Sequence, residues 1–314
     1  MKQFLSVKDV ADPVAFAKEG LELKKDPFRD ELLGKHRVLG LVFFNPSLRT
    51  RMSTARAAYN LGMKVITLNV SADSWQLETE DGAIMDQGKA EHIKEAAAVM
   101  GNYCEILGIR SFPTLTDREA DYKEQLMQAF RDNTSVPLVS LESGTVHPLQ
   151  SLADLMTIEE FKKVSKPKVV MTWAPHIRAL PQAVPNSFAQ WMNRANVDFT
   201  ITHPAGLELA EEFSGEANVM HNQLEALEGA DFVYVKNWSS YHEYGKVHDD
   251  RSWIMDLEKL KVTNGAKMMH CLPVRRNVVI ADDALDSGHS IVQEQALNRV
   301  YSAQIVLKKM LLEL

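Results

Sequence analysis

Residues 38–51 of this chain read Val38-Leu39-Gly40-Leu41-Val42-Phe43-Phe44-Asn45-Pro46-Ser47-Leu48-Arg49-Thr50-Arg51. The apolar run that opens this stretch has the length of a buried strand, and Asn45-Pro46 ends it. A helix is expected to follow, with Ser47 as a candidate N-cap residue. Arginine and hydroxyl side chains at a strand-to-helix turn predict an anion site, because free backbone N–H groups and the helix dipole attract negative charge there. A capped helix with solvated arginines is the alternative, and it stays open at this point.

Short apolar runs alternate with amphipathic helical segments on both sides of this stretch. The expected strands are residues 38–44, 65–68, 105–108, 138–141, 169–173, 199–202, 232–235 and 267–270. The expected helices are residues 51–61, 92–100, 123–131, 149–163 and 292–314. This alternation predicts an α/β fold of two doubly wound parallel sheets, with four of these strands in each.

Composition narrows the classes of function that remain. The chain has 314 residues, with 35 basic and 42 acidic side chains and a net charge of −7. That balance argues against a general nucleic-acid binder, which needs a basic surface, but it allows a small basic pocket. No apolar run approaches the ~20 residues that span a bilayer. Lys8 and Asp9 interrupt the first apolar run too early for a secretory signal, and Cys104 and Cys271 show no disulfide spacing, so we expect a cytoplasmic protein.

Two other strand ends carry polar side chains. The segment His147-Pro148-Leu149-Gln150 opens a helix directly after an expected strand, where open α/β sheets bind ligands. The segment His270-Cys271-Leu272-Pro273 ends the last expected strand. A capping histidine and a small buried cysteine are the simpler interpretations, and neither segment decides the matter alone.

Two segments that look like ligand sites fail on spacing. Residues 82–90 look like a phosphate-binding loop, but they have one residue too many between the glycines, and Ala90 replaces the required hydroxyl residue. We interpret them as a functional loop of another kind. Residues 241–250 contain histidines and carboxylates without a metal-binding spacing, so we expect a solvated loop there and no metal.

The order of the motifs along the chain is more informative than any one of them. That order is Ser47-Leu48-Arg49-Thr50-Arg51, Arg110, His147-Pro148-Leu149-Gln150, His270-Cys271-Leu272-Pro273 and Asn298-Arg299. Over essentially its full length, the chain resembles the aspartate and ornithine carbamoyltransferases. Leu48 departs from the usual S-T-R-T-R loop of that family, although the backbone N–H at that position remains. A bulky apolar residue there is similar to the branch of the family that acts on N-acylated ornithine.

The resemblance implies a fold, a division of labour and an assembly. It implies two α/β domains of the carbamoyltransferase fold, the second knotted around the stiff loop 180–185. Residues 1–147 and 291–314 would bind carbamoyl phosphate, and residues 148–290 would bind the N-acylornithine acceptor. It also implies a homotrimer with shared active sites, in which Trp75 comes from the neighbouring subunit. It implies no cofactor, no nucleic acid and no membrane partner.

The resemblance assigns three groups of functional residues in this chain. The catalytic residues would be Arg110, His147 and Cys271. The carbamoyl phosphate site would comprise Ser47, Leu48, Arg49, Thr50, Trp75, Arg110, His147, Gln150, Cys271, Leu272 and Arg299. The acylornithine site would comprise Ala90, Glu142, His176, Arg178, Lys236, Leu272 and Arg276.

The nature of the acceptor depends on the charge at position 236. Ornithine carbamoyltransferases have an aspartate there that would pair with a free α-ammonium, and this chain has Lys236. The reversed charge disfavours a free α-ammonium and suits an acylated α-nitrogen beside a carboxylate. At position 90 the acetyl-specific branch has a glutamate and the succinyl branch a proline; Ala90 matches neither, but it would not repel a succinyl carboxylate.

We therefore expect transfer of the carbamoyl group to the δ-amine of N-succinylornithine, in a route to arginine. N-acetylornithine and then ornithine are the alternative acceptors. A non-catalytic relative that binds carbamoyl phosphate is the alternative of a different class, although the retained Arg49, Arg110, His147 and Arg299 argue against it.

Overall fold

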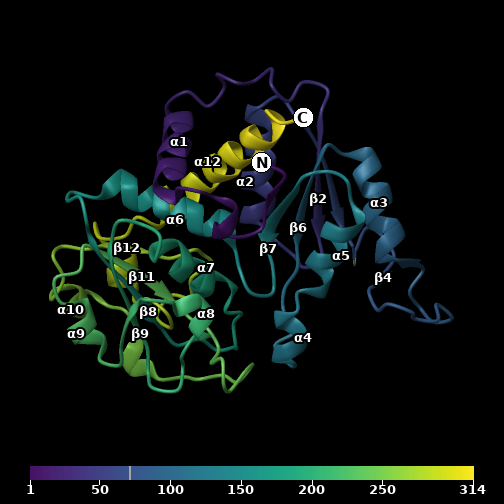
Figure 1. The fold of residues 1–314 in the computed structure, drawn as a ribbon. Helices are drawn as coiled ribbons and strands as arrows, with labels where there is room; N and C mark the ends of the chain where they lie inside the picture. Colours follow the sequence, from purple (N-terminus) through teal and green to yellow (C-terminus); the bar gives the residue numbers. More distant parts are fainter. Residues whose placement is uncertain (71) are drawn as a thin grey trace.

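The computed structural model describes residues 1–70 and 72–314 and contains two α/β units (Figure 1). Each unit is built on a five-stranded sheet whose neighbouring strands all run parallel. The first sheet has the order β1-β7-β6-β2-β3, with strands β1 (Gln3–Phe4), β2 (Val38–Phe43), β3 (Lys64–Asn69), β6 (Ile106–Arg110) and β7 (Leu138–Glu142). The second has the order β10-β9-β8-β11-β12, with strands β8 (Lys168–Trp173), β9 (Asp198–Thr202), β10 (Asn218–Met220), β11 (Phe232–Lys236) and β12 (Lys267–Met269). These findings confirm the predicted α/β fold with two parallel sheets.

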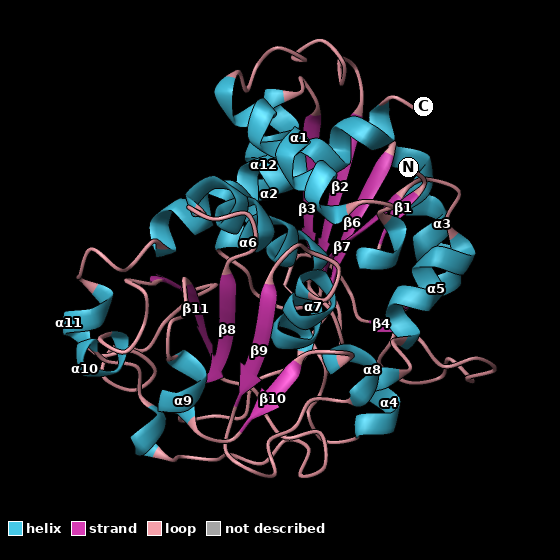
Figure 2. Cartoon of the chain, turned by 60° about the vertical axis from the view of Figure 1, so that its left-hand side comes forward, coloured by secondary structure: helices cyan, strands magenta, loops and turns pink. Residues whose placement is uncertain are grey.

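Helices flank both sheets, as Figure 2 shows. The longer helices are α1 (Pro13–Lys25), α2 (Arg49–Asn60), α3 (Ile93–Tyr103), α5 (Gln125–Asn133), α6 (Pro148–Phe161), α7 (Ala183–Met192) and α12 (Val292–Leu311). The short helices are α4 (Arg118–Tyr122), α8 (Glu211–Ser214), α9 (Gln223–Leu227), α10 (Leu257–Leu260), α11 (Asp282–Leu285), and the 3₁₀ turns η1 (Val7–Asp9) and η2 (Arg251–Trp253). Two short strands, β4 (Leu77–Glu78) and β5 (Glu91–His92), pair in parallel at the ends of a loop.

Successive side chains of a strand point to opposite faces of its sheet, so each sheet contributes to two separate hydrophobic cores. Leu39 and Leu41 of β2 face the core shared with α1, α2 and α12, whereas Val42 faces the core under α3 and α5. In the second sheet, Met171 and Tyr234 face α6 and α7, and the alternate residues face α9, α10 and α11. Because both faces are covered, the strands read as continuous apolar runs, which is why they were predictable.

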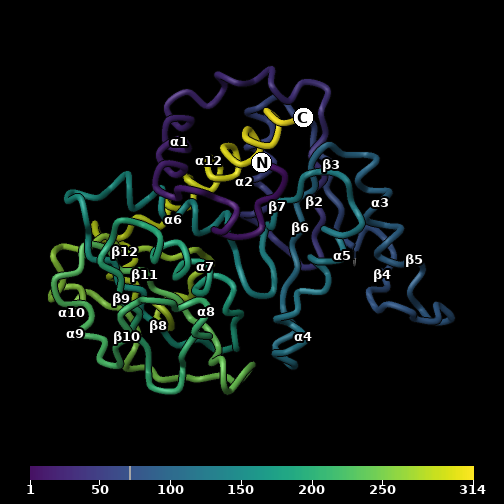
Figure 3. The backbone as a smooth tube through the Cα atoms, viewed as in Figure 1, coloured from purple at the N-terminus to yellow at the C-terminus, as the bar shows by residue number. Residues whose placement is uncertain are grey.

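The C-terminal helix α12 returns to the first unit. It packs against α1, α2 and α6, and Figure 3 shows its yellow trace beside the purple and blue traces of α1 and α2. Its buried face includes Asn298, Arg299 and Gln304 together with apolar residues. This packing places Arg299 next to the start of α2, more than two hundred residues earlier in the chain.

Two local predictions were wrong. Ser47 is not the N-cap of α2, because the helix begins at Arg49 and Leu48 occupies the cap position without a side-chain hydrogen bond. The expected loop 180–185 is a loop only in part, because α7 begins at Ala183 and includes Pro185 in its first turn. Proline is tolerated there, since first-turn N–H groups have no partner within the helix.

Both sheets have a point at which the strand order reverses, between β2 and β6 and between β8 and β11. Ligands of open α/β sheets bind outside the carboxyl ends of the strands at such points. Asn45 follows β2, Arg110 ends β6, Ala174 follows β8 and Lys236 ends β11. The topology therefore predicts a site in which loops from both units take part.

The two units also touch through α4 and the loop after β11. The Arg118 guanidinium lies 4.2 Å from the centre of the Tyr241 ring, and it donates a 2.9 Å hydrogen bond to the Tyr241 carbonyl. The Tyr244 hydroxyl donates to Asp121 at 3.0 Å. Gly245, with φ +75°, leaves no room for a Cβ, which would overlap the Leu115 carbonyl oxygen.

Replacing Gly245 by alanine should therefore lower the free energy of unfolding by about 2–4 kcal/mol, since left-handed strain and overlap with the Leu115 carbonyl add together. Gly265→Ala is the matched control: Gly265 has φ +63° with open space around it, so about 1–2 kcal/mol is expected from strain alone. Urea unfolding followed by circular dichroism measures both. Equal losses in the two variants would contradict a close contact between Gly245 and Leu115.

Candidate active site

A cavity of about 490 Å³ lies where the two units meet. Side chains from both units line it. They are Thr50, Phe112, Glu142, His147, Gln150, His176, Arg178, Leu180, Pro181, Val184, Lys236, Cys271, Leu272, Pro273, Val274, Arg275 and Arg299. The cavity thus brings together, in one place, most of the residues that the sequence motifs singled out.

One end of the cavity lies at the start of α2, where Thr50 lines it. Leu48 offers no side-chain cap, so the first-turn N–H groups keep no partner within the helix. The buried Nε of Arg49 has no hydrogen-bond partner among the described residues. Arg299 donates from Nη2 to the Thr50 hydroxyl at 2.6 Å, and it remains cationic although burial lowers its pKa to about 10. Ser47 is half-buried beside this turn, and the Leu48 side chain points to solvent.

Arg110 is held at the end of β6 by a set of fixed acceptors. Its Nη2 lies 3.0 Å from Glu142 Oε2, and its Nη1 donates to the carbonyl oxygens of Pro46 (2.7 Å) and Asn45 (3.1 Å). Glu142 ends the neighbouring strand β7, so the pair spans two strand ends. Burial raises the pKa of Glu142, and Arg110 opposes that shift. The guanidinium is therefore preorganised before any ligand binds.

His147 is a neutral imidazole in this site. It is buried at the N-cap position of α6, and its Nε2 lies 3.8 Å from Glu142 Oε2. Burial lowers its pKa well below the usual value, and the positive charges of Arg299 and Arg110 act in the same direction. Its Nδ1 has no partner among the residues described. A neutral ring with one N–H can donate a hydrogen bond to a carbonyl oxygen in the cavity.

The second unit contributes an amine and a thiol. Lys236 ends β11, and its Nζ donates to the Asn237 carbonyl at 2.8 Å. Burial lowers the pKa of Lys236, while Cys271 and Glu142 oppose the shift. Burial also raises the pKa of the Cys271 thiol, which favours the uncharged form. Leu272 follows, with its N–H bonded to His270 Nδ1 at 2.8 Å, so this turn has a fixed shape.

Arg275 lines the cavity, and Arg276, which the motif had suggested, does not. Arg276 is exposed and is paired with Asp282 (2.9 Å) and Asp286 (2.7 Å) on α11 and the turn after it. Arg275 instead donates from Nε to His176 Nε2 at 3.2 Å. Two adjacent arginines follow β12 in irregular backbone, so no sequence period could tell which of them faces the site. Arg178, also predicted, is exposed at the cavity rim.

Trp75 and Ala90 lie outside this cavity. Trp75 is 57% exposed, and its Nε1 donates to Glu91 at 2.9 Å. Ala90 is exposed in the loop between β4 and β5. Neither residue lines the cavity of its own chain.

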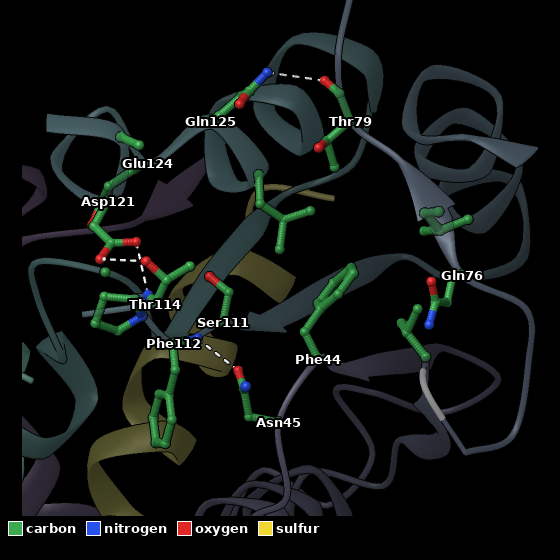
Figure 4. A pocket seen from close by; sticks show the side chains of 16 residues that line it. Phe44, Asn45, Gln76, Thr79, Ser111, Phe112, Thr114, Asp121, Glu124 and Gln125 are labelled. Atoms are coloured by element: carbon green, nitrogen blue, oxygen red, sulfur yellow. Dashed lines mark hydrogen bonds between the residues drawn. The ribbon is translucent and has the colours of Figure 1, made fainter. Parts of the chain in front are cut away.

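A second cavity, of about 480 Å³, lies on the other side of Phe112 and is shown in Figure 4. Phe112 lines both cavities. Its N–H donates to Asn45 Oδ1 at 2.6 Å, and the Arg110 guanidinium stacks over its ring at 4.1 Å. These contacts hold Phe112 as a fixed wall of the first cavity.

A cationic cavity between two α/β units, with fixed N–H donors and a buried lysine, is typical of an enzyme that acts on small anionic substrates. The carbamoyl-P binding domain of the aspartate/ornithine carbamoyltransferases matches residues 2–160, and the Asp/Orn binding domain of the same family matches residues 181–310. The chain belongs to the aspartate/ornithine carbamoyltransferase family.

Individual relatives match the chain from end to end. An N-succinylornithine carbamoyltransferase of Bacteroides thetaiotaomicron is 52% identical over 99% of this chain and 99% of its own. An N-acetylornithine carbamoyltransferase of Xanthomonas axonopodis pv. citri is 32% identical over 98% of this chain and 96% of its own. A glutamate-to-alanine variant of N-acetyl-L-ornithine transcarbamylase, complexed with carbamyl phosphate and N-succinyl-L-norvaline, superposes with a TM-score of 0.90 at 31% identity, covering 99% of this chain and 100% of that one.

Arg49→Ala should weaken the binding of inorganic phosphate by about 10- to 100-fold, because a charge-assisted hydrogen bond to the anion is lost. Isothermal titration calorimetry measures the dissociation constant. Arg51→Ala is the control, since Arg51 is exposed on the same helix, whereas Arg49 is partly buried with an unpartnered Nε. Unchanged affinity in Arg49→Ala, or an equal loss in Arg51→Ala, would show that the anion binds elsewhere.

Proposed function

We propose that this protein transfers the carbamoyl group from carbamoyl phosphate to the δ-amine of N-succinyl-L-ornithine, giving N-succinyl-L-citrulline and phosphate in a route to arginine. The observation that supports this most is the cavity itself, with an uncapped helix start and arginines at one end and Lys236 at the other. The 52% identical relative named N-succinylornithine carbamoyltransferase supports the same acceptor.

Carbamoyl phosphate fits the end formed by the first unit and α12. The phosphate would lie at the start of α2, against Ser47, the Leu48 N–H, Arg49, Thr50 and Arg299. The carbonyl oxygen would then accept from Arg110, His147 and the Thr50 hydroxyl, all of which line or border the same space. Gln150 would bind the amide nitrogen.

In the transfer step, the uncharged δ-amine attacks the carbamoyl carbon and forms a new C–N bond. Negative charge grows on the carbonyl oxygen, where Arg110 and His147 stabilise it. The C–O bond to phosphate then breaks, its electron pair leaves with the phosphate, and the phosphate accepts the surplus amine proton. Much of the acceleration comes from holding two substrates together in one cavity. The uncharged Cys271 thiol and the Leu272 carbonyl would contact the attacking amine.

The acceptor fits the end formed by the second unit. N-succinylornithine carries two carboxylates and an uncharged α-nitrogen, and Lys236, Arg178 and Arg275 supply three positive charges around this end. Lys236 would repel the α-ammonium of free ornithine. Glu142 and His176 would contact the backbone and acyl amide of the acceptor. We accordingly assign carbamoyl phosphate to residues 1–147 with 291–314, and the acceptor to residues 148–290.

A homotrimer would complete the site. Leu48, Met52 and Tyr59 leave an exposed apolar face along α2, and Ile66 extends it on the edge strand β3. Contact through this face would bring the loop with Trp75 and Ala90 of one subunit to the cavity of the next. Trp75 would then help to enclose carbamoyl phosphate, and Ala90 would border the succinyl group. The two free cysteines fit a reducing cytoplasm.

A phosphate-release assay with carbamoyl phosphate and a panel of acceptors tests the proposed function. N-succinylornithine should give the highest kcat/KM, N-acetylornithine a lower one, and free ornithine a value at least about 100-fold lower, because Lys236 faces its α-ammonium. Aspartate is the negative control. Turnover of ornithine alone would contradict the argument from Lys236, and phosphate-site binding without turnover of any acceptor would instead favour a non-catalytic relative.

Subunit complementation tests the shared site. Arg49→Ala and Trp75→Ala should each abolish most activity, and trimers reassembled from an equal mixture should recover about a quarter of the wild-type rate. That fraction follows because a wild-type site needs Arg49 from one variant chain and Trp75 from the other as its neighbour. No recovery in mixed trimers, whose formation is verified by native mass spectrometry, would place Trp75 in the site of its own chain or outside any site.

A further inference from the structure

Asp154 is a fully buried carboxyl in the middle of α6 that has no part in the transfer chemistry described above. Its Oδ1 accepts two hydrogen bonds from primary amides. One comes from Gln150 Nε2 at 2.8 Å, one helical turn earlier, and the other from Gln295 Nε2 of α12 at 2.6 Å. A single oxygen therefore fixes two amide side chains from two helices.

The first bond fixes which end of Gln150 faces the cavity. Because Nε2 donates to Asp154, Oε1 is the free end, and it has no partner among the described residues. Gln150 lines the cavity, so this buried oxygen is an acceptor for a ligand N–H. Carbamoyl phosphate has such an N–H donor in its amide group. Among the described residues, Asp154 is the only hydrogen-bond partner of the Gln150 carboxamide, so without it the amide is free to rotate and present its NH₂ group instead.

The second hydrogen bond of Asp154, from Gln295, leads to the turn that contains Cys271. Gln295 Oε1 accepts from the His270 backbone N–H at 2.8 Å, directly before Cys271. The Tyr234 hydroxyl of β11 lies next to both Asp154 and the Cys271 thiol. Neither this hydroxyl nor Asp154 Oδ2 has a hydrogen-bond partner in residues 1–70 and 72–314, so the link to the Cys271 turn runs through Gln295. The carboxyl thus touches groups that lead to both substrates.

We propose that Asp154 is a positioning residue for carbamoyl transfer, which fixes the Gln150 carboxamide with its oxygen toward the carbamoyl NH₂ group and holds the His270-Cys271 turn through Gln295. This inference rests on the proposed binding of carbamoyl phosphate in the cavity. It predicts selectivity for an amide-bearing phosphate ligand over phosphate itself.

The charge state of Asp154 makes a matched control available. Burial raises the pKa of Asp154 to about 7, so the uncharged acid is substantially populated at neutral pH. Asparagine has the same shape and keeps an oxygen for the two glutamine donors, with an N–H₂ group toward Tyr234. Leucine also has a similar shape, but it offers no acceptor.

The experiment compares the binding of phosphonoacetamide, a stable ligand with the amide and phosphonate of carbamoyl phosphate, with that of inorganic phosphate. Isothermal titration calorimetry on the full-length protein measures both. Asp154→Leu should raise the dissociation constant of phosphonoacetamide by about tenfold, because one hydrogen bond to its amide is lost. The dissociation constant of inorganic phosphate should stay within about twofold of the wild-type value. Asp154→Asn should keep the wild-type ratio of the two dissociation constants. Asp154→Ala serves as the second acceptor-free variant, with folding of each checked by circular dichroism.

If Asp154→Leu and Asp154→Ala lost affinity for both ligands equally, the proposal would be overturned, because such a result would indicate a general structural role. A wild-type ratio in those variants would overturn it as well. In turnover, Asp154→Leu should lower kcat by about 100-fold, as expected for a misplaced reactant, and Asp154→Asn should restore most of it. The binding measurements need no acceptor, so a wild-type protein that binds phosphonoacetamide selectively but turns over no acceptor would contradict the proposed function and not this inference.

Discussion

The accumulation of positive charge in one partly buried cavity is the constraint on which the rest of the structure depends. Burial lowers the pKa values of Arg49, Arg299 and Lys236, so keeping these cations there costs free energy. Glu142 offsets part of that cost through its ion pair with Arg110. Under the proposed function, the binding of anionic substrates would offset the rest of this free-energy cost. The buried cations therefore lower the stability of the protein and raise its affinity for anions. The net charge of −7 shows that the positive charge is concentrated locally.

In a cavity of this kind the cations must be held close together despite their mutual repulsion. The fold holds most of them at the ends of helices and strands. Arg49 is the first residue of α2, Arg110 the last of β6, and Lys236 the last of β11. Arg299 lies within α12, whose packing on α2 brings it to Thr50. Each cation therefore has its backbone set by a helix or a sheet, and not by a mobile loop. Such preorganised donors are what stabilise developing charge in a transition state.

The parts of this arrangement that depend on local pattern could be predicted from the sequence, and those that depend on packing could not. Strands covered on both faces read as apolar runs, whereas the edge strands β1 and β10 are too short to leave a pattern. The helix α7 was missed because Pro185 lies in its first turn. Arg275 could not be distinguished from Arg276, since the irregular backbone after β12 has no period. The Asp154 hydrogen bonds join α6 and α12, and no motif indicates contacts between elements so far apart in the chain.

Under the proposed division of the two substrates between the units, helix α6 would set their relative position. It begins directly after His147, near the end of the first sheet, and β8 of the second sheet follows its last residue closely. Its first two turns carry Gln150, which lines the cavity, and Asp154, which is linked through Gln295 to the turn before Cys271. A displacement of about 1 Å between reacting groups lowers a rate by about 100-fold. Under the proposed function, this buried helix would set the distance between the carbamoyl carbon and the attacking amine. It carries buried polar side chains at Gln150, Ser151, Asp154 and Thr157.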